Sequence, residues 1–175
     1  MRLVSGVLVL ITASLLACGT RESPAADQSA GLPPVFSNLE GSWEGTGVLL
    51  GRPAAFAMSW EVGTAGFVYL TFSNAWVEED GTSIPVLSAR ATYLVSDSSA
   101  LGVWVDDRPQ RLTLDAVVTD SSVVTNWIAE AEEGRTEYVV RASTGLVVRD
   151  FVTVDGAERP FAEASYRRSP TDPAR

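Results

Sequence analysis

The chain has 175 residues, enough for one domain and a remainder, with 22 acidic and 13 basic side chains and a net charge of −9. It contains no histidine and one cysteine, and every basic residue is an arginine. These counts exclude histidine-dependent catalytic triads, histidine-ligated haem, histidine-built zinc sites and intrachain disulfides. The acidic balance also argues against a nucleic-acid partner, because such proteins carry a basic face.

Residues 1–17 have the charge order and length of a secretory signal peptide, with Arg2 first and an apolar run up to Ala17. The run is shorter than the ~20 residues of a spanning helix, although an uncleaved membrane anchor is the alternative. Its end, LLAC, resembles the lipobox of bacterial lipoproteins. The resemblance implies cleavage before Cys18 and lipidation of its sulfur. Several acyl chains on Cys18 would hold the protein firmly to membrane lipid, since each buried methylene adds ~0.8 kcal/mol.

The lipoprotein resemblance implies a lipid-anchored protein of the cell envelope. Gly19 stands where an aspartate would resemble the inner-membrane retention signal of enteric bacteria. We therefore expect the outer membrane, facing the periplasm, if the cell is Gram-negative. Residues 18–34 are rich in Gly, Ser, Ala and Pro and are predicted to form a flexible tether after the lipidated cysteine. A domain over 35–168 and a disordered tail over 169–175 complete the predicted organisation.

Strand patterns dominate the domain. Apolar and polar residues alternate, or Val, Thr and aromatic residues gather, in the segments 56–62, 66–77, 87–96, 111–118, 121–129, 135–142, 145–154 and 160–167. Turn dipeptides such as Asp80-Gly81 and Glu133-Gly134 separate them. The segment 66–77 is apolar on both faces, which indicates a strand covered on one side or a wide lumen. No segment shows a helical period. About ten short strands without helices predict an all-β sandwich or barrel.

Three elements in order resemble a bacterial family of small lipocalin-like barrels and the related nitrobindins. They are G-x-W-x-G-x-G around Trp43, G-x-W-x-D around Trp104, and the closing residues 160–168. The resemblance implies a single antiparallel up-and-down β-barrel of about ten strands. Nitrobindins bind haem through a histidine, which this chain lacks, so we expect no cofactor and no metal.

The first of these elements is predicted to close one end of the barrel. Gly41, Gly45 and Gly47 allow the strand to bend, and Trp43 fills the floor. In lipocalins an arginine near the C-terminus stacks on this tryptophan. Arg167 or Arg168 matches by position, and we assign Arg167 to barrel closure.

Six residues on different predicted strands are candidates for a ligand site, because a few polar groups in an apolar cavity orient a ligand. A buried arginine would need a carboxylate partner, so Arg90 is expected to pair with Asp106 or Glu163. Strand parity leaves open which candidates face solvent. The six candidates are Arg90, Trp104, Asp106, Asn126, Trp127 and Glu163.

Three functions remain open at the level of sequence. The first is a lipoprotein whose barrel binds a small apolar or amphipathic ligand. The second is a structural or interaction lipoprotein of the cell envelope, with a filled barrel and an exposed apolar patch. The third is an enzyme that works through carboxylates or arginine, although no catalytic residue can be singled out. The acidic clusters at 78–80, 106–107 and 130–133 lack EF-hand spacing and are predicted to be solvated turns. The sequence leaves the oligomeric state undetermined.

Overall fold

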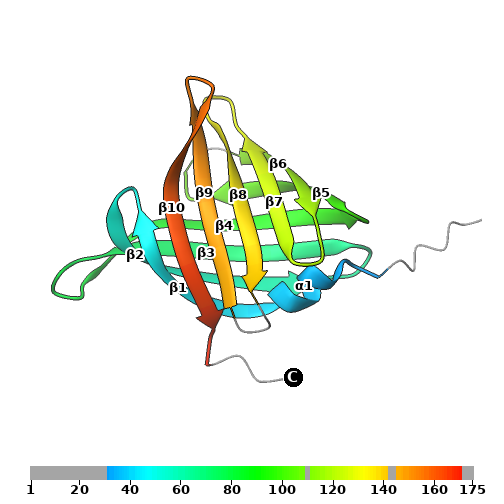
Figure 1. Cartoon of the computed structure of the whole chain (residues 1–175), viewed down its shortest axis with the longest axis horizontal. Coiled ribbons are helices and arrows are strands. Elements are labelled where there is room, and N and C mark those ends of the chain that lie inside the picture. Colours follow the sequence, from blue (N-terminus) through cyan, green and yellow to red (C-terminus); the bar gives the residue numbers. More distant parts are fainter. Residues whose placement is uncertain (1–30, 109–110, 142–144, 171–175) are drawn as a thin grey trace, which may run out of the picture.

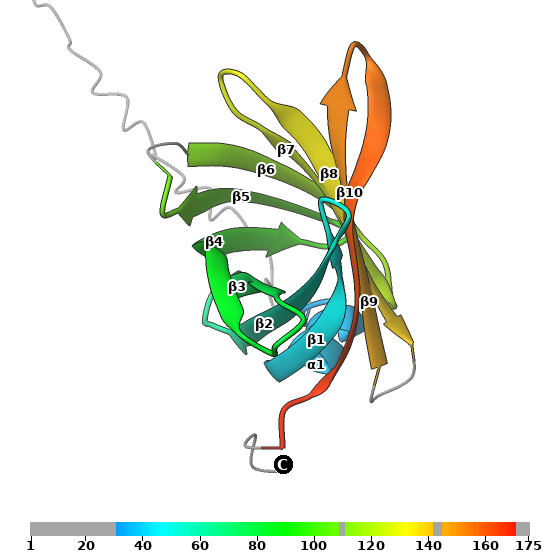
Figure 2. The ribbon, with the colours of Figure 1, turned by 90° about the vertical axis from the view of Figure 1, so that its left-hand side faces the viewer.

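Ten antiparallel strands close into one barrel in the computed structural model, which describes residues 31–108, 111–141 and 145–170. Each strand pairs with the next along the chain, and β10 (Ala157–Arg168) returns to lie beside β1 (Gly41–Leu49), as Figures 1 and 2 show. The predicted all-β, single up-and-down barrel is confirmed. The other strands are β2 (Arg52–Val62), β3 (Phe67–Val77), β4 (Ser83–Ser96), β5 (Ser99–Asp106), β6 (Arg111–Val118), β7 (Ser122–Ile128), β8 (Glu133–Arg141) and β9 (Gly145–Val154).

The alternation of the sequence separates the inside of the barrel from the outside. Strand β6 is the clearest case, because Leu112, Leu114, Ala116 and Val118 are buried while each residue between them is exposed. Successive side chains of a strand point to opposite faces, so a polar residue at every second position stays in water. The apolar set of each strand therefore meets in one central core.

The up-and-down connectivity gives the barrel two different ends. The connections β1–β2, β3–β4, β5–β6, β7–β8 and β9–β10 all lie at one end. The opposite end carries the start of β1, the end of β10 and a short helix, α1 (Pro34–Leu39), which is visible beside the strands in Figure 1. This second end forms the floor of the barrel.

Helix α1 was not predicted from the sequence. Its six residues make fewer than two turns, too few for a hydrophobic period to stand out. Pro34 occupies its first turn, where the missing N–H costs nothing. Val35, Phe36 and Leu39 are buried, so the helix covers the floor. The predicted tether therefore ends before Pro34. Among the described residues no helix is long and apolar enough to cross a membrane.

The predicted tail also begins later than expected. Ser169 is buried, its backbone N–H donates to the carbonyl of Ser42 at 2.8 Å, and its hydroxyl donates to Glu44 at 2.9 Å. These two hydrogen bonds extend the contact between the C-terminal strand and β1 by one residue. The assignment of residue 169 to a disordered tail was wrong, because such bonds to a distant strand leave no trace in the sequence.

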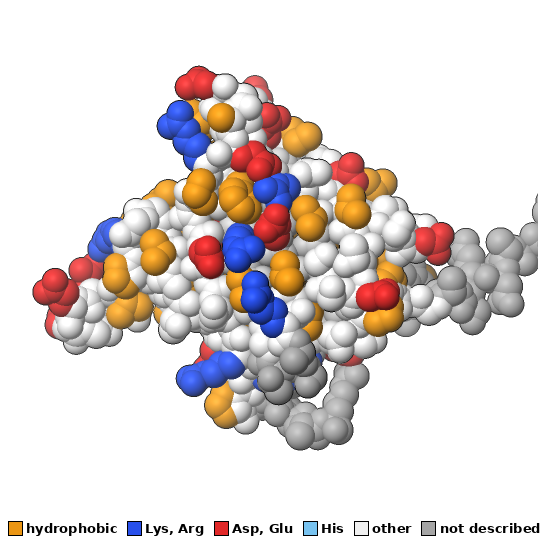
Figure 3. All heavy atoms as spheres, viewed as in Figure 1, with side chains coloured by type: hydrophobic (Ala, Val, Ile, Leu, Met, Phe, Trp, Pro, Cys, Tyr) orange, Lys and Arg blue, Asp and Glu red, His pale blue; other side chains and the backbone are white. Residues whose placement is uncertain are grey.

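The outer surface carries both ion pairs and apolar side chains. Blue and red side chains lie next to one another in the middle of the face in Figure 3, where β8, β9 and β10 run. Arg135 bonds Glu158 at 2.7 Å and also Glu137, and Arg149 lies 3.6 Å from Glu163. On β3 the outward residues Phe67 and Tyr69 are exposed, whereas the next two outward residues, Thr71 and Ser73, are polar, so the segment 66–77 is apolar on its outer side only near its start.

Candidate functional site: a cavity inside the barrel

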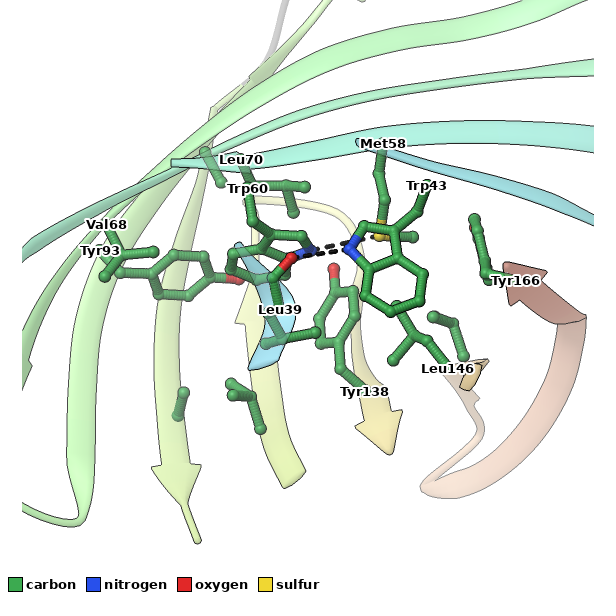
Figure 4. Close-up of a cluster of buried hydrophobic side chains, with 14 of the residues drawn as sticks. Leu39, Trp43, Met58, Trp60, Val68, Leu70, Tyr93, Tyr138, Leu146 and Tyr166 are labelled. Carbon is green, nitrogen blue, oxygen red and sulfur yellow. Dashed lines mark hydrogen bonds between the residues drawn. The ribbon is translucent and has the colours of Figure 1, made fainter. Parts of the chain in front are cut away.

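Trp43 forms the floor beneath the cavity. Its indole N–H donates to the carbonyl of Leu39 at 2.7 Å, which joins β1 to helix α1, as the dashed line in Figure 4 shows. Trp60 lies beside it in the same figure, with its N–H directed at the sulfur of Met58 at 3.2 Å. Both tryptophans are almost completely buried. The floor is therefore packed around these two indole rings.

Arg168, not Arg167, stacks on this tryptophan. The guanidinium of Arg168 lies 4.5 Å from the ring of Trp43 and donates to the carbonyls of Glu40 and Asn38 at 2.6 and 2.9 Å. Register gives the reason: Trp43 faces Arg168 across the β1–β10 pair, whereas Arg167 faces Glu44 on the outward side. The assignment of Arg167 to closure was wrong, because two adjacent arginines cannot be separated without the register.

The glycines of the first element have three different local roles. Gly41 has a φ of 110°, which a residue with a side chain rarely adopts. The ring of Tyr166 lies directly over Gly45, where a Cβ atom would come within 2.6 Å of it. At Gly47 a Cβ atom would come within 2.0 Å of the carbonyl oxygen of Glu163. The motif therefore permits the close approach of β1 and β10 that completes the barrel.

Above the floor the barrel holds a cavity of about 390 Å³. Four aromatic side chains form much of its wall. Phe72 lies 5.7 Å from Trp104 between ring centroids, and Trp127 meets Phe161 edge to face at 6.5 Å. Leu and Val side chains from β6 and β9 complete the apolar part. A volume of this size and character lies within the range of small-molecule sites.

Gly134 makes room for one of these aromatic walls. It faces Trp127 across the β7–β8 pair, and a Cβ atom there would come within 2.3 Å of the indole ring. The Glu133-Gly134 dipeptide was predicted to be a turn, but both residues belong to strand β8. The glycine is used for the space it leaves beside Trp127 rather than for a turn.

A group of hydroxyls lines the inner side of the cavity. The hydroxyls of Tyr93 and Thr125 lie 3.4 Å apart, and Tyr138 is hydrogen-bonded to Tyr93. Burial raises the pKa of Tyr93 to about 12 and that of Tyr138 well above its ordinary value. Both phenols are therefore neutral at physiological pH and can donate or accept hydrogen bonds.

Asp150 is a carboxylate in the cavity wall that is not at the mouth. It faces Thr136 across the β8–β9 pair, and the hydroxyl of Thr136 donates to it at 2.6 Å. Burial raises the pKa of Asp150 to about 6, although the hydrogen bond from Thr136 acts in the opposite direction. Among the described residues no arginine forms an ion pair with Asp150. At pH 7 the charged carboxylate of Asp150 therefore accepts one hydrogen bond within the described residues, from the hydroxyl of Thr136.

Asn74 is a second polar residue of the wall. It sits on β3 beside a register shift at Ala75, and its side chain is buried. Within the described chain its carbonyl oxygen Oδ1 has no hydrogen-bond partner. A buried acceptor without a partner costs about 1–3 kcal/mol, which a ligand with a donor group would recover.

The mouth of the cavity carries a cluster of charges. Arg108 bonds Asp106 at 2.7 Å and Glu132 at 3.1 Å, and the N–H of Trp104 donates to Asp106 at 2.9 Å. Burial alone would raise the pKa of Asp106, but the bonds from Arg108 and Trp104 outweigh it and hold the pKa below its ordinary value. These bonds fix the Trp104 ring against the cavity. Arg108 and Glu132 line the cavity and were missed by sequence reasoning, since both lie next to predicted turns.

The structure divides the six predicted site residues into two groups. Trp104 and Trp127 line the cavity, and Asp106 supports Trp104 at the mouth. The other three point outward: Arg90, Asn126 and Glu163 are exposed. The expected pairing of Arg90 was wrong, because Asp106 bonds Arg108 and Glu163 lies by Arg149. Cys18, the signal peptide and most of the tether lie outside the described residues.

Comparison with known proteins supports the fold and leaves the family open. No family model matches the sequence, and a search of the curated proteins finds no match. Among solved structures, the crystal structure of Rv2717c from M. tuberculosis is similar, with a TM-score of 0.61 and 16% identity over 79% of this chain and 99% of that chain. A redesigned β-barrel, mFAP1, bound to DFHBI, matches with a TM-score of 0.45 and 11% identity over 77% of this chain and 99% of that one. The first likeness shows the shared barrel fold, and the second is too low to carry an argument.

Proposed function

We propose that this protein is a membrane-anchored lipoprotein whose lipocalin-like barrel binds a small, largely apolar ligand. The observation that carries the proposal is the cavity of about 390 Å³, walled by Phe72, Trp104, Trp127 and Phe161. A barrel that served only as a scaffold would gain stability by filling this space, because each unfilled volume forfeits packing contacts. The unpartnered oxygen of Asn74 in the wall adds a point at which a ligand would be oriented.

The anchor part of the proposal rests on sequence. The LLAC ending places the one cysteine of the chain at the end of an apolar segment, where it can be lipidated. Helix α1, which covers the floor of the barrel, begins at Pro34, so a short segment of sequence would connect Cys18 to it. The barrel would then remain in water beside the membrane, with its mouth free to receive a ligand.

Binding is tested on the chain from Gly19 onward, which retains every contact of the described barrel. Titration with an apolar fluorophore, together with native mass spectrometry, should show one bound molecule. Val152 lines the cavity, and Val152→Trp should block the fluorophore. Val117 is 58% exposed on the outside, so Val117→Trp is the matched control and should bind normally. Unchanged binding in Val152→Trp would refute an internal site.

The second candidate, an interaction lipoprotein with a filled barrel, has mixed support. The cavity argues against the filled barrel. The outer face of β3–β5 nevertheless exposes apolar side chains that are neighbours by register, since Phe67 faces Leu94 and Leu94 faces Leu101. Leu101→Glu would separate the two functions: it should abolish complex formation measured by cross-linking in cells if this face binds a partner, and should leave ligand binding unchanged.

A further inference from the structure

We propose that the cavity selects ligands whose polar end is a protonated amine, in preference to fatty acids of the same length. The inference rests on the proposed function, namely that the barrel binds a small apolar ligand, and it specifies the chemistry of the end that lies among the polar residues of the wall.

The charge inside the barrel is unbalanced. Asp150 projects from β9 into the cavity wall, where Thr136 is the one hydrogen-bond donor to its carboxylate among the described residues. Its other neighbours in the core, Tyr138 and Tyr166, are neutral phenols at pH 7. A carboxylate in the wall of a largely apolar cavity with no cation beside it is unfavourable, and a ligand ammonium would supply the missing charge.

Hydrogen bonding at Asn74 favours an amine independently of Asp150. The oxygen Oδ1 of Asn74 is a buried acceptor with no partner in the described chain, and Asn74 lines the same cavity. A carboxylate ligand has only acceptors to offer at pH 7, so it would leave this oxygen unsatisfied. An amine head carries several N–H donors and can satisfy acceptors in the wall.

The charges around the mouth of the cavity also favour a cationic ligand. Arg108 is the arginine that lines the cavity, and it already bonds Asp106 and Glu132. With Asp150 included, the cavity and its mouth hold three carboxylates and one guanidinium. The whole chain has a net charge of −9, which also attracts cations and repels anions. A fatty acid would therefore place a further negative charge where negative charge already predominates.

The test compares three probes that differ only in the head group: decylamine, decanol and decanoate. Each is titrated at pH 7 into the chain from Gly19 onward, and binding is followed by the fluorescence of the cavity tryptophans and by calorimetry. Because an opposite charge shifts the pKa of a carboxylate by about one to three units, the ion pair should favour decylamine over decanol by roughly tenfold or more. Decanoate should bind more weakly than decanol.

Two variants assign the preference to Asp150. Asp150→Asn keeps the size and the acceptor but removes the charge, so decylamine should lose roughly tenfold in affinity while decanol changes little. Asp115 is exposed on the outside of β6. Asp115→Asn removes the same charge from the chain and should leave the preference intact. A circular-dichroism melt shows that both variants are folded.

The outcomes separate the two proposals. If decanol or decanoate binds as tightly as decylamine, or if Asp150→Asn keeps the amine preference, the selection of amines is refuted while the cavity remains a ligand site. If none of the three probes binds, the proposed function fails and this inference fails with it.

Discussion

At the scale of single residues, the closure of the barrel depends on Arg168. Its guanidinium stacks on Trp43 and holds two backbone carbonyls at the end of helix α1 and just beyond it. Its neighbour Arg167 points outward and makes none of these contacts. Two adjacent and chemically identical residues should thus contribute differently to the free energy of unfolding.

This difference gives the first prediction. Arg168→Ala should lower the free energy of unfolding by ~2–4 kcal/mol, from the loss of a cation–π contact and two charge-assisted hydrogen bonds. Arg167→Ala should change it by less than about 0.5 kcal/mol, as exposed substitutions usually do. Urea denaturation of both variants measures the difference. Equal effects would show that the stacking does not stabilise the floor.

Asp150 gives a prediction about pH. Because its pKa is raised from 3.8 to about 6 on folding, the native state binds the proton more tightly than the unfolded state. This contribution to stability is fully present below pH 4 and is lost as the pH rises through 6. Asp150→Asn should therefore stabilise the ligand-free protein at pH 7 by ~1–3 kcal/mol and have little effect at pH 4. Thermal melts at both pH values check this, and a destabilised variant at pH 7 would reveal a partner for the carboxylate.

At the scale of secondary-structure elements, the pairing of β7 with β8 shapes the cavity. Gly134 leaves the space in which the ring of Trp127 lies, and the same glycine closely approaches the carbonyl of Phe151 on β9. The missing side chain thus affects two strand pairs at once. The sequence pattern predicts that this glycine belongs to a turn, since a glycine after a polar residue is a common turn signal.

We predict that Gly134→Ala destabilises the barrel by ~1–3 kcal/mol and shifts Trp127, because the new methyl group overlaps both neighbours. The emission maximum of the tryptophans and a thermal melt measure the two effects. Gly31→Ala is the control, since no atom lies within 4 Å of a Cβ at that position. A variant with unchanged emission and stability would show that the strands can separate without loss.

At the scale of the whole molecule, the proposed anchor would determine where the barrel can meet a ligand. Cys18→Ala should abolish incorporation of labelled palmitate and release the barrel from the envelope fraction, because its acyl chains supply the membrane affinity. Ser14→Ala, which leaves the cysteine in place, is the control and should remain labelled. Labelling of the Cys18→Ala variant would contradict lipidation at this residue.

The class and connectivity of the fold could be predicted from local patterns in the amino-acid sequence. Alternating patterns such as the one in β6 depend on a period of two, which local sequence displays directly, and short turns between strands imply neighbours that pair in order. The lack of histidine likewise excluded whole classes of chemistry from composition alone. Helix α1 could not be predicted, because six residues are too few to show a helical period.

Which residues face the cavity, by contrast, depends on how the strands pair in the closed barrel. Trp104 and Trp127 could be predicted as cavity residues from the sequence, because large aromatic residues within strands are usually buried for the most part. Arg90 and Glu163 could not be excluded, since one step of strand register turns a side chain from the lumen to water. The role of Asp150 was also hidden: a carboxylate beside an arginine in sequence looks solvated, and only the closed barrel places it inside while Arg149 points out.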